Sequence, residues 1–333
     1  MLINKIVSMQ DCEAPLVRAD VPRPNPAADE VLLRVSACGV CHTELDEIEG
    51  RAPPPVLPVI PGHEVVGRIV EIGNAVTQHA VGDRVGVGWI FNSSGDTDEN
   101  ISEQFVATGR DANGGYAEFM TVSERYAYRI PGNLADEQVA PLLCAGSVGY
   151  RALITTGINN GNILGLTGFG GSGHLVLQLA KFIYSASPVY VFARSSEERQ
   201  FALELGADWV GDTTDQPPQP PHAIIDTTPA WLPVLAALKC LRPGGRLVIN
   251  AIRKESDDKS VLAEIDYADH LWREKQLVTV ANVTARDIRS CLDIAAQAGI
   301  KPRVETYKLD DANTALAELR SSHVRGAKVL KMT

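Results

Sequence analysis

The sequence contains no long uninterrupted apolar run. Residues 1–20 alternate apolar with polar or charged residues, so they lack the continuous apolar stretch of a signal peptide. No later run reaches the roughly 20 apolar residues that a membrane-spanning helix needs. These two absences predict a cytoplasmic protein that is not embedded in a membrane.

The chain also lacks an excess of positive charge. It has 31 Lys and Arg against 41 Asp and Glu, which gives a formal net charge of -10 at pH 7. Nucleic acids and anionic membrane surfaces select for basic patches on their protein partners. The charge balance therefore argues against both classes of partner, and it leaves a small molecule as the expected ligand.

Cysteine is scarce, and the six cysteines in 333 residues are too few for a disulfide scaffold. In a reducing compartment they are expected to be free thiols or metal ligands. The composition, with 45% hydrophobic and 22% charged residues, is that of an ordinary globular protein. A chain of this length is long for one hydrophobic core, which predicts two domains.

The predicted secondary structure changes near residue 162. Before it, apolar runs such as 31–35 and 64–72 are separated by turn residues, which predicts a β-rich region. After it, the predicted strands 162–167 and 188–193 flank a helical pattern over 174–184. Alternating strands and helices are typical of a parallel sheet with helices on both faces.

A glycine-rich segment lies between the first of these strands and the helix. Gly168, Gly170, Gly171 and Gly173 occur in the order GFGGSG, which fits the GxGxxG pattern. Such glycines allow a tight turn and let a pyrophosphate approach backbone amides at the positive end of a helix. An ordinary glycine-rich turn is the alternative, but the position after a strand and before a helix favours a dinucleotide site.

The end of the second strand bears on the choice of cofactor. NAD-binding domains of this kind carry Asp or Glu there for the adenosine ribose, whereas this chain has Ala193, Arg194 and Ser195. A missing carboxylate removes repulsion of a 2′-phosphate, and Arg194 can bind that phosphate through a charge-assisted pair of hydrogen bonds. These residues favour NADP, with NAD as the possible alternative if Arg194 only stacks on adenine or faces solvent.

Three separate segments contain potential zinc ligands, namely 38–44 (CGVCHTE), 62–64 (GHE) and 143–146 (LCAG). Together with the dinucleotide pattern, the chain resembles the zinc-dependent alcohol dehydrogenases of the medium-chain dehydrogenase/reductase superfamily. The resemblance extends from residue 35 to about residue 330. It includes the further motifs GDRV at 82–85, GGYAE at 114–118 and LGAD at 205–208.

The resemblance implies one catalytic zinc ion. Its protein ligands would be Cys41, His63 and Cys144, which leave the fourth tetrahedral position for water or the substrate oxygen. Glu64 matches a carboxylate that approaches the metal or aids ligand exchange. Glu44 falls where the family usually has Asp, and it would orient His63.

The resemblance also implies the remaining catalytic parts. Zinc acts as a Lewis acid on the substrate oxygen, and hydride moves between the substrate carbon and nicotinamide. Thr43 matches the hydroxyl that begins a proton relay by taking the proton of the alcohol. Many relatives end this relay with His where this chain has Asp46, so Asp46 or water would complete it.

His42 matches a pyrophosphate-contacting position, with an exposed, unengaged histidine as the alternative. Trp89 matches an aromatic lining the substrate site, which favours small or slender primary alcohols and small secondary ones; plain core packing is the other explanation.

One region departs from the family pattern. Many relatives hold a second, structural zinc with four closely spaced cysteines, whereas residues 93–102 of this chain contain none. Ser94, Thr97 and Ser102 occupy plausible former ligand positions, and neutral hydroxyls bind zinc poorly. The prediction is that no structural zinc is bound and that hydrogen bonds alone hold a comparatively mobile loop.

These observations predict an α/β protein with two domains. A GroES-like β-rich catalytic domain is expected over 1–145 and 286–333, with a Rossmann doubly wound parallel-sheet domain over 146–285. The active site is expected in the cleft between them. The family also leads us to expect a homodimer or a homotetramer.

Three alternative functions differ from this interpretation in their chemistry. A zinc-free NADPH-dependent quinone or enoyl reductase would lack the Cys, His and Cys set. A non-catalytic dinucleotide-binding redox sensor would have no use for Thr43 or an open zinc position. Within the zinc enzymes, a member acting on polyols or on an activated aldehyde stays open on the sequence alone.

Overall fold

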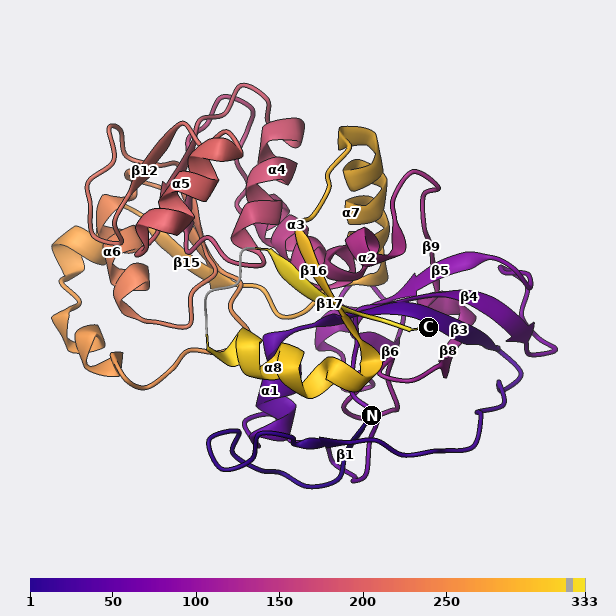
Figure 1. The fold of residues 1–333 in the computed structure, drawn as a ribbon. Coiled ribbons are helices and arrows are strands. Elements are labelled where there is room, and N and C mark those ends of the chain that lie inside the picture. The colour runs from indigo at the N-terminus through magenta and orange to yellow at the C-terminus, as the bar shows by residue number, and fades with distance from the viewer. Residues whose placement is uncertain (322–325, 333) are drawn as a thin grey trace. The chain divides into compact units, whose positions relative to one another are not determined.

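The computed structural model describes residues 1–321 and 326–332, and these form two compact units (Figure 1). One unit, the β-rich unit, comprises Met1–Ser147 and Asn282–Thr333. The other, the α/β unit, comprises Val148–Ala281. Among the described residues, no helix combines the length and the apolar character needed to cross a membrane.

The β-rich unit is built on a seven-stranded sheet whose central strand is β3 (Glu30–Val40). One edge of β3 pairs with β4, while β8 and then β17 share its other edge. Apart from the parallel pair β16–β17, the strand pairs of this sheet are antiparallel. The remaining strands of the sheet are β4 (Val65–Ile72), β5 (Arg84–Val87), β8 (Phe119–Ser123), β9 (Tyr128–Arg129), β16 (Val304–Lys308) and β17 (Ala327–Lys331).

Short elements complete this unit. Two small antiparallel pairs, β1–β2 and β6–β7, lie outside the main sheet. The short strands are β1 (Leu2–Ile3), β2 (Leu16–Val17), β6 (Ile90–Asn92) and β7 (Val106–Ala107), and the helices are α1 (His42–Ile48), α2 (Asp136–Val139), α7 (Ala285–Ala298) and α8 (Ala312–Arg320). Single 3-10 turns are η1 (Glu99–Ile101), η2 (Glu124–Tyr126), η3 (Ala140–Leu143) and η6 (Leu309–Asp311).

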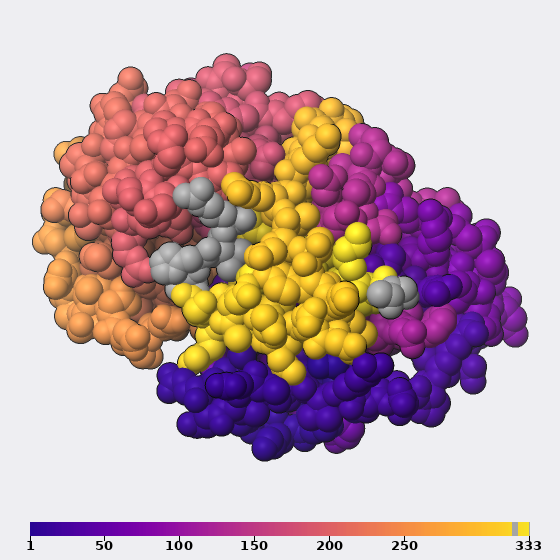
Figure 2. Space-filling view, in the orientation of Figure 1, coloured from indigo at the N-terminus to yellow at the C-terminus, as the bar shows by residue number. Residues whose placement is uncertain are grey.

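The C-terminal part of the chain returns to the β-rich unit, where Figure 2 shows its yellow atoms against the indigo N-terminal residues. The side chain of Asn313 bonds both the backbone N–H and the carbonyl of Leu16, each at 2.9 Å. Arg320, the last residue of α8, forms an ion pair with Glu49 at 3.3 Å. Strand β17 also pairs with the last residues of β3, so the C-terminal segment supports the strand that leads into α1.

The α/β unit confirms the predicted parallel sheet. Its six strands lie in the order β12-β11-β10-β13-β14-β15, and all neighbouring pairs are parallel. Every residue of β10, β11 and β13 is buried, as expected for central strands covered on both faces. The strands are β10 (Leu164–Thr167), β11 (Val189–Phe192), β12 (Trp209–Gly211), β13 (Ala223–Asp226), β14 (Arg246–Ile249) and β15 (Gln276–Thr279).

The helices of the α/β unit connect these strands. Helix α3 (Ala145–Thr155) begins in the β-rich unit and leads into the α/β unit. Helix α4 follows β10 and helix α5 follows β11, so the predicted strand, helix, strand order is confirmed. The helices and turns are α4 (Gly173–Ile183), α5 (Ser196–Glu204), α6 (Leu232–Cys240), η4 (Lys259–Glu264) and the short π-helix η5 (Tyr267–Leu271).

Hydrogen bonds hold the cysteine-free loop 93–102. Ser93 Oγ donates to the carbonyl of Glu99 at 2.7 Å. The buried Glu99 carboxylate accepts from Tyr126 Oη at 3.0 Å and from the backbone N–H of Ala285 at 2.6 Å. Burial together with the bond to Glu99 raises the pKa of Tyr126 to about 12. The loop is therefore joined to the start of α7 through one carboxylate, and the absence of a structural zinc stays a prediction.

Candidate functional site

Strand pairing brings three chain segments of the β-rich unit to one place. Cys41 directly follows β3, and His63 and Glu64 directly precede β4. The antiparallel register pairs Cys38 with Val65, so these segments lie beside each other at the end of the sheet. Cys144 follows the 3-10 turn η3 and precedes α3.

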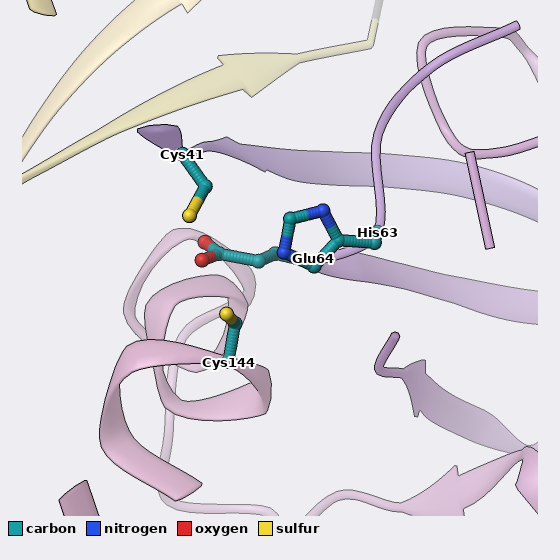
Figure 3. Close-up of side chains that lie close together, drawn as sticks. All are labelled: Cys41, His63, Glu64 and Cys144. Atoms are coloured by element: carbon teal, nitrogen blue, oxygen red, sulfur yellow. The ribbon is translucent and has the colours of Figure 1, made fainter. Parts of the chain in front are cut away.

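The side chains of Cys41, His63, Glu64 and Cys144 converge (Figure 3). One ligand atom from each lies within 4.8 Å of the others, and this is the only such metal-ligand group among the described residues. Two sulfurs, an imidazole nitrogen and a carboxylate form a donor set that suits tetrahedral zinc. The structure thus brings together the three predicted ligands and the neighbouring glutamate.

Glu44 fixes the orientation of the His63 ring. His63 Nδ1 lies 2.6 Å from Glu44 Oε1, and both side chains are buried. Because a carboxylate only accepts, Nδ1 carries the proton in this contact. His63 Nε2 is buried and has no hydrogen-bond partner. An unpartnered imidazole nitrogen facing two thiols is the arrangement expected of a metal ligand held by a carboxylate behind it.

The two thiols influence each other's protonation. The neighbouring Cys144 thiol, and then the His63 ring, hold the pKa of Cys41 well below its usual value. The neighbouring Cys41, together with burial, raises the pKa of Cys144 well above its usual value. Binding of a divalent cation to such a pair would release the remaining proton, since thiolates rather than thiols ligate zinc.

Gly39 makes room for the Glu64 carboxylate. A Cβ atom at position 39 would lie 1.7 Å from Glu64 Oε2, and the Gly39 N–H donates to the Glu64 carbonyl at 2.9 Å. The glycine therefore lets strand and carboxylate approach closely. Burial and the nearby Cys41 raise the pKa of Glu64 well above its usual range. Sequence reasoning missed this role of Gly39, because it depends on a neighbour across the sheet.

Helix α1 carries the residues predicted for proton transfer. Thr43 is buried, and its Oγ1 lies 3.6 Å from Cys41 Sγ, so its hydroxyl belongs to the cluster. Asp46 is also buried, but its carboxylate accepts from Arg51 Nε at 2.6 Å. His42, the predicted pyrophosphate contact, is exposed at the start of the helix.

Trp89 lies beside the metal-ligand group. Its ring centroid is 6.1 Å from that of His63 and 5.5 Å from that of Phe105, which it meets edge to face. The guanidinium of Arg110 lies 5.9 Å from the centroid of the Trp89 ring. The tryptophan is half-buried, and its Nε1 is enclosed without a hydrogen-bond partner. Neither Phe105 nor Arg110 carries a sequence signal that would have placed it here.

The glycine-rich segment of the α/β unit forms the turn between β10 and α4. Gly168 has a φ of +78°, and a Cβ there would lie 2.8 Å from Thr227 Oγ1. At Gly173, a Cβ would lie 2.6 Å from the Gly168 carbonyl. Only glycine suits both positions, which is the physical basis of the predicted pattern.

The segment after β11 presents the predicted cofactor residues. Arg194 is exposed, and Ser195 Oγ caps helix α5 by accepting from the backbone N–H of Glu198 at 3.1 Å. Arg199 donates to the carbonyls of Ala193 at 2.7 Å and of Arg194 at 3.0 Å, so a second guanidinium lies at this turn. Arg199 was not predicted, although its place one turn into α5 is visible in the sequence.

Two family models match the chain. The first, "Alcohol dehydrogenase GroES-like domain", matches residues 27–132, and the second, "Zinc-binding dehydrogenase", matches residues 171–297. A probable alcohol dehydrogenase of Mycobacterium tuberculosis is 40% identical over 327 residues, which are 95% of this chain and 92% of that protein. An alcohol dehydrogenase of Geobacillus stearothermophilus is 33% identical over 98% of this chain and 99% of its own length.

Solved structures agree with these relatives. The alcohol dehydrogenase of Aeropyrum pernix has a TM-score of 0.84 at 25% identity, with 99% of this chain and 98% of that one covered. The protein named CAD of Helicobacter pylori, solved with NADP(H), has a TM-score of 0.80 at 26% identity over 92% and 91% of the two chains. The predicted combination of a GroES-like and a Rossmann fold is confirmed. The chain belongs to the zinc-dependent alcohol dehydrogenases of the medium-chain dehydrogenase/reductase superfamily, and it is an oxidoreductase that interconverts alcohols and carbonyl compounds.

Proposed function

We propose that this chain catalyses reversible hydride transfer between a small primary or secondary alcohol and NADP, with one zinc ion held by Cys41, His63 and Cys144. The observation that carries the proposal is the convergence of these three side chains, with the buried Nε2 of His63 unpartnered. Zinc bound there would polarise the substrate oxygen as a Lewis acid, while the nicotinamide exchanges hydride with the substrate carbon.

The protein's own residues prepare and complete this chemistry. Glu44 keeps the proton of His63 on Nδ1, which leaves Nε2 for the metal. Thr43 Oγ1, 3.6 Å from Cys41 Sγ, is placed to accept the proton of the substrate hydroxyl. Asp46 is engaged by Arg51, so we assign the exit of the proton beyond Thr43 to water. Glu64 lies among the ligands, where it can assist ligand exchange.

The residues after β11 support a preference for NADP. Arg194 is exposed and no carboxylate occupies the end of the strand, while Arg199 adds a second positive charge at the same turn. Two guanidinium groups favour a 2′-phosphate over a free ribose hydroxyl. The structural relatives do not decide the matter, because one is a complex with NADP(H) and another, the acetophenone reductase of Geotrichum candidum, a complex with NAD.

Trp89 supports a restricted substrate size. The indole ring of Trp89 lies beside His63, and the ring of Phe105 packs edge to face against the same indole. A bulky aromatic close to the reacting centre favours small or slender alcohols and aldehydes over branched ones. The names of the relatives, which include cinnamyl alcohol and mannitol dehydrogenases, span both slender aromatic and polyhydroxylated substrates.

The exposed surface of the α/β unit supports self-association into a homodimer or homotetramer. Strand β15 is the edge of the sheet, and three of its four residues are exposed, including Leu277. Tyr267 and Trp272, in the segment just before β15, are also exposed large side chains. An unpaired strand edge with apolar neighbours favours pairing with a second copy.

Removal of zinc is expected to abolish turnover and to change folding little. Dialysis of the purified protein against a zinc chelator should lower aldehyde reduction at least about 100-fold, and added Zn²⁺ should restore it. The melting temperature should shift by only a few degrees, because hydrogen bonds rather than a second metal hold loop 93–102. Elemental analysis should give one zinc per chain. Two zinc ions per chain, or turnover that resists chelation, would contradict the proposal.

Loss of the Thr43 hydroxyl is expected to slow proton transfer. Thr43→Ala should lower kcat about 10²–10⁴-fold while zinc content and cofactor affinity stay unchanged. Thr43→Ser, which keeps the hydroxyl, should retain most of the activity and is the matched control. Steady-state kinetics with metal analysis and a cofactor titration provide the readouts. Equal activity of the Ala and Ser variants would refute the role of this hydroxyl.

Replacement of Arg194 is expected to remove the preference for NADPH. Arg194→Ala should raise KM for NADPH about ten-fold or more and leave KM for NADH nearly unchanged, since one charge-assisted contact is lost. Arg242→Ala, at an exposed arginine elsewhere in the same unit, serves as control. A parallel loss with both cofactors, or no loss with either, would rule out recognition of the 2′-phosphate by Arg194.

The assembly state can be measured directly. Light scattering after size-exclusion chromatography should give two or four protomer masses for the wild type. Leu277→Asp, which places a charge on the exposed edge strand, should shift the protein toward the monomer. A wild-type monomer at micromolar concentration would contradict the proposed association.

A further inference from the structure

One acidic side chain beside the metal-ligand group has no assigned role. Glu47 lies on helix α1, four residues after Thr43 and three after Glu44, so the three side chains share one face of the helix. Thr43 contacts Cys41 from this face and Glu44 contacts His63. Glu47 is therefore the next residue along the face that borders the metal ligands.

The Glu47 carboxyl is fully buried and unpartnered. Its exposure is 0%, and neither Oε1 nor Oε2 has a hydrogen-bond partner. The other acidic residues near the end of α1 are satisfied, because Asp46 and Glu49 both pair with Arg51, at 2.6 and 2.7 Å. An unpartnered buried carboxyl costs folding free energy, so Glu47 calls for a partner that the described residues do not supply.

The surroundings of Glu47 are those of the metal-ligand group. Burial raises the pKa of Glu47 well above its usual range and Glu44 raises it further, while His63 and Arg110 oppose them. Arg110 does not pair with Glu47, because it donates to both carboxylate oxygens of Asp111 at 2.8 Å. The same Arg110 lies over Trp89, whose ring is next to His63.

Trp89 supplies a second unsatisfied polar atom near His63. Its Nε1 is buried without a partner, although a buried indole N–H normally has one. A donor and a carboxyl, both unsatisfied, thus occur among the side chains around one metal ligand. Apolar substrates such as plain alkyl aldehydes would leave both unsatisfied, whereas a substrate with a further polar group would not.

We propose that Glu47 determines specificity by hydrogen-bonding a second hydroxyl group of the substrate, so that hydroxylated aldehydes and the corresponding diols are preferred over alkyl analogues of the same size. This inference rests on the proposed function. A hydroxyl both donates and accepts, as a protonated carboxyl does, so the two groups are complementary. An ammonium group is disfavoured, because the guanidinium of Arg110 already places a positive charge over Trp89 in the same surroundings.

The test compares substrates that differ by one hydroxyl in place of one methyl group. The pairs are glycolaldehyde with propanal, 3-hydroxypropanal with butanal, and 4-hydroxybutanal with pentanal. Wild-type protein should prefer the hydroxylated member of at least one pair about ten-fold or more in kcat/KM. Glu47→Leu should abolish that preference by slowing only the hydroxylated member, and Glu47→Gln should keep part of it.

Stability separates this role from a structural one. Glu47→Leu should keep or raise the melting temperature, because it removes an unsatisfied buried group. Glu49→Leu, directly after the same helix, is the matched control: it breaks ion pairs to Arg51 and Arg320, so it should lower the melting temperature and leave the substrate preference unchanged. An equal loss of activity on both members of each pair in Glu47→Leu would show a structural role and overturn the proposal.

A binding measurement keeps the two proposals distinguishable. In a thermal-shift titration, 1,3-propanediol should stabilise the wild type more than 1-butanol does, and Glu47→Leu should erase this difference. Zinc-dependent reduction of alkyl aldehydes without any hydroxyl preference would overturn the role of Glu47 alone. Absence of turnover on every aldehyde would refute the proposed function, and the role of Glu47 would then be decided by the titration.

Discussion

The antiparallel pairing of β3 with β4 is the constraint on which the site depends. Cys41 leaves the end of one strand as His63 and Glu64 enter the start of the other, and the Gly39 N–H bonded to the Glu64 carbonyl at 2.9 Å closes the pair. A slip of one residue would turn every side chain of β4 to the opposite face of the sheet. The apolar residues of β3 and Val65, Val66 and Ile69 of β4 are buried in the present register, so the hydrophobic core and the positions of these ligands are set together.

Electrostatics around α1 follow from this arrangement. The chain segment from Glu44 to Glu49 contains four acidic residues, and three of them have partners: Glu44 with His63, and Asp46 and Glu49 with Arg51. Glu44 contacts the ligand His63, whereas Asp46 is held by a cation outside the group. Glu44 and Asp46 are two residues apart and lie on different faces of the helix, as the 3.6-residue period requires.

Much of the fold and part of the site could be predicted from sequence, for identifiable reasons. Gly168 and Gly173 stand where the backbone leaves room for no other residue, so the sequence pattern predicts the turn. The alternation of buried strands with helices predicts the parallel sheet, which the structure contains. Cys41 and Cys144 drew attention because cysteine is rare here and chemically distinctive. The roles of Gly39, Arg110 and Arg199 depend on neighbours distant in the chain or on side-chain direction. Local patterns carry no information about such contacts.

In loop 93–102 one buried carboxylate, that of Glu99, bonds to donors from two other chain segments. Structural zinc stabilises a loop by satisfying several ligands at one point, at the cost of deprotonated thiols. The Glu99 carboxylate also joins several groups at one point, because it accepts hydrogen bonds from the hydroxyl of Tyr126 and from the backbone N–H of Ala285, the first residue of α7. The positive end of that helix favours a carboxylate there. Both partners belong to the β-rich unit, and Ala285 lies in the C-terminal segment that also contains β17. This one segment therefore anchors the loop through Ala285 and supports β3 through β17.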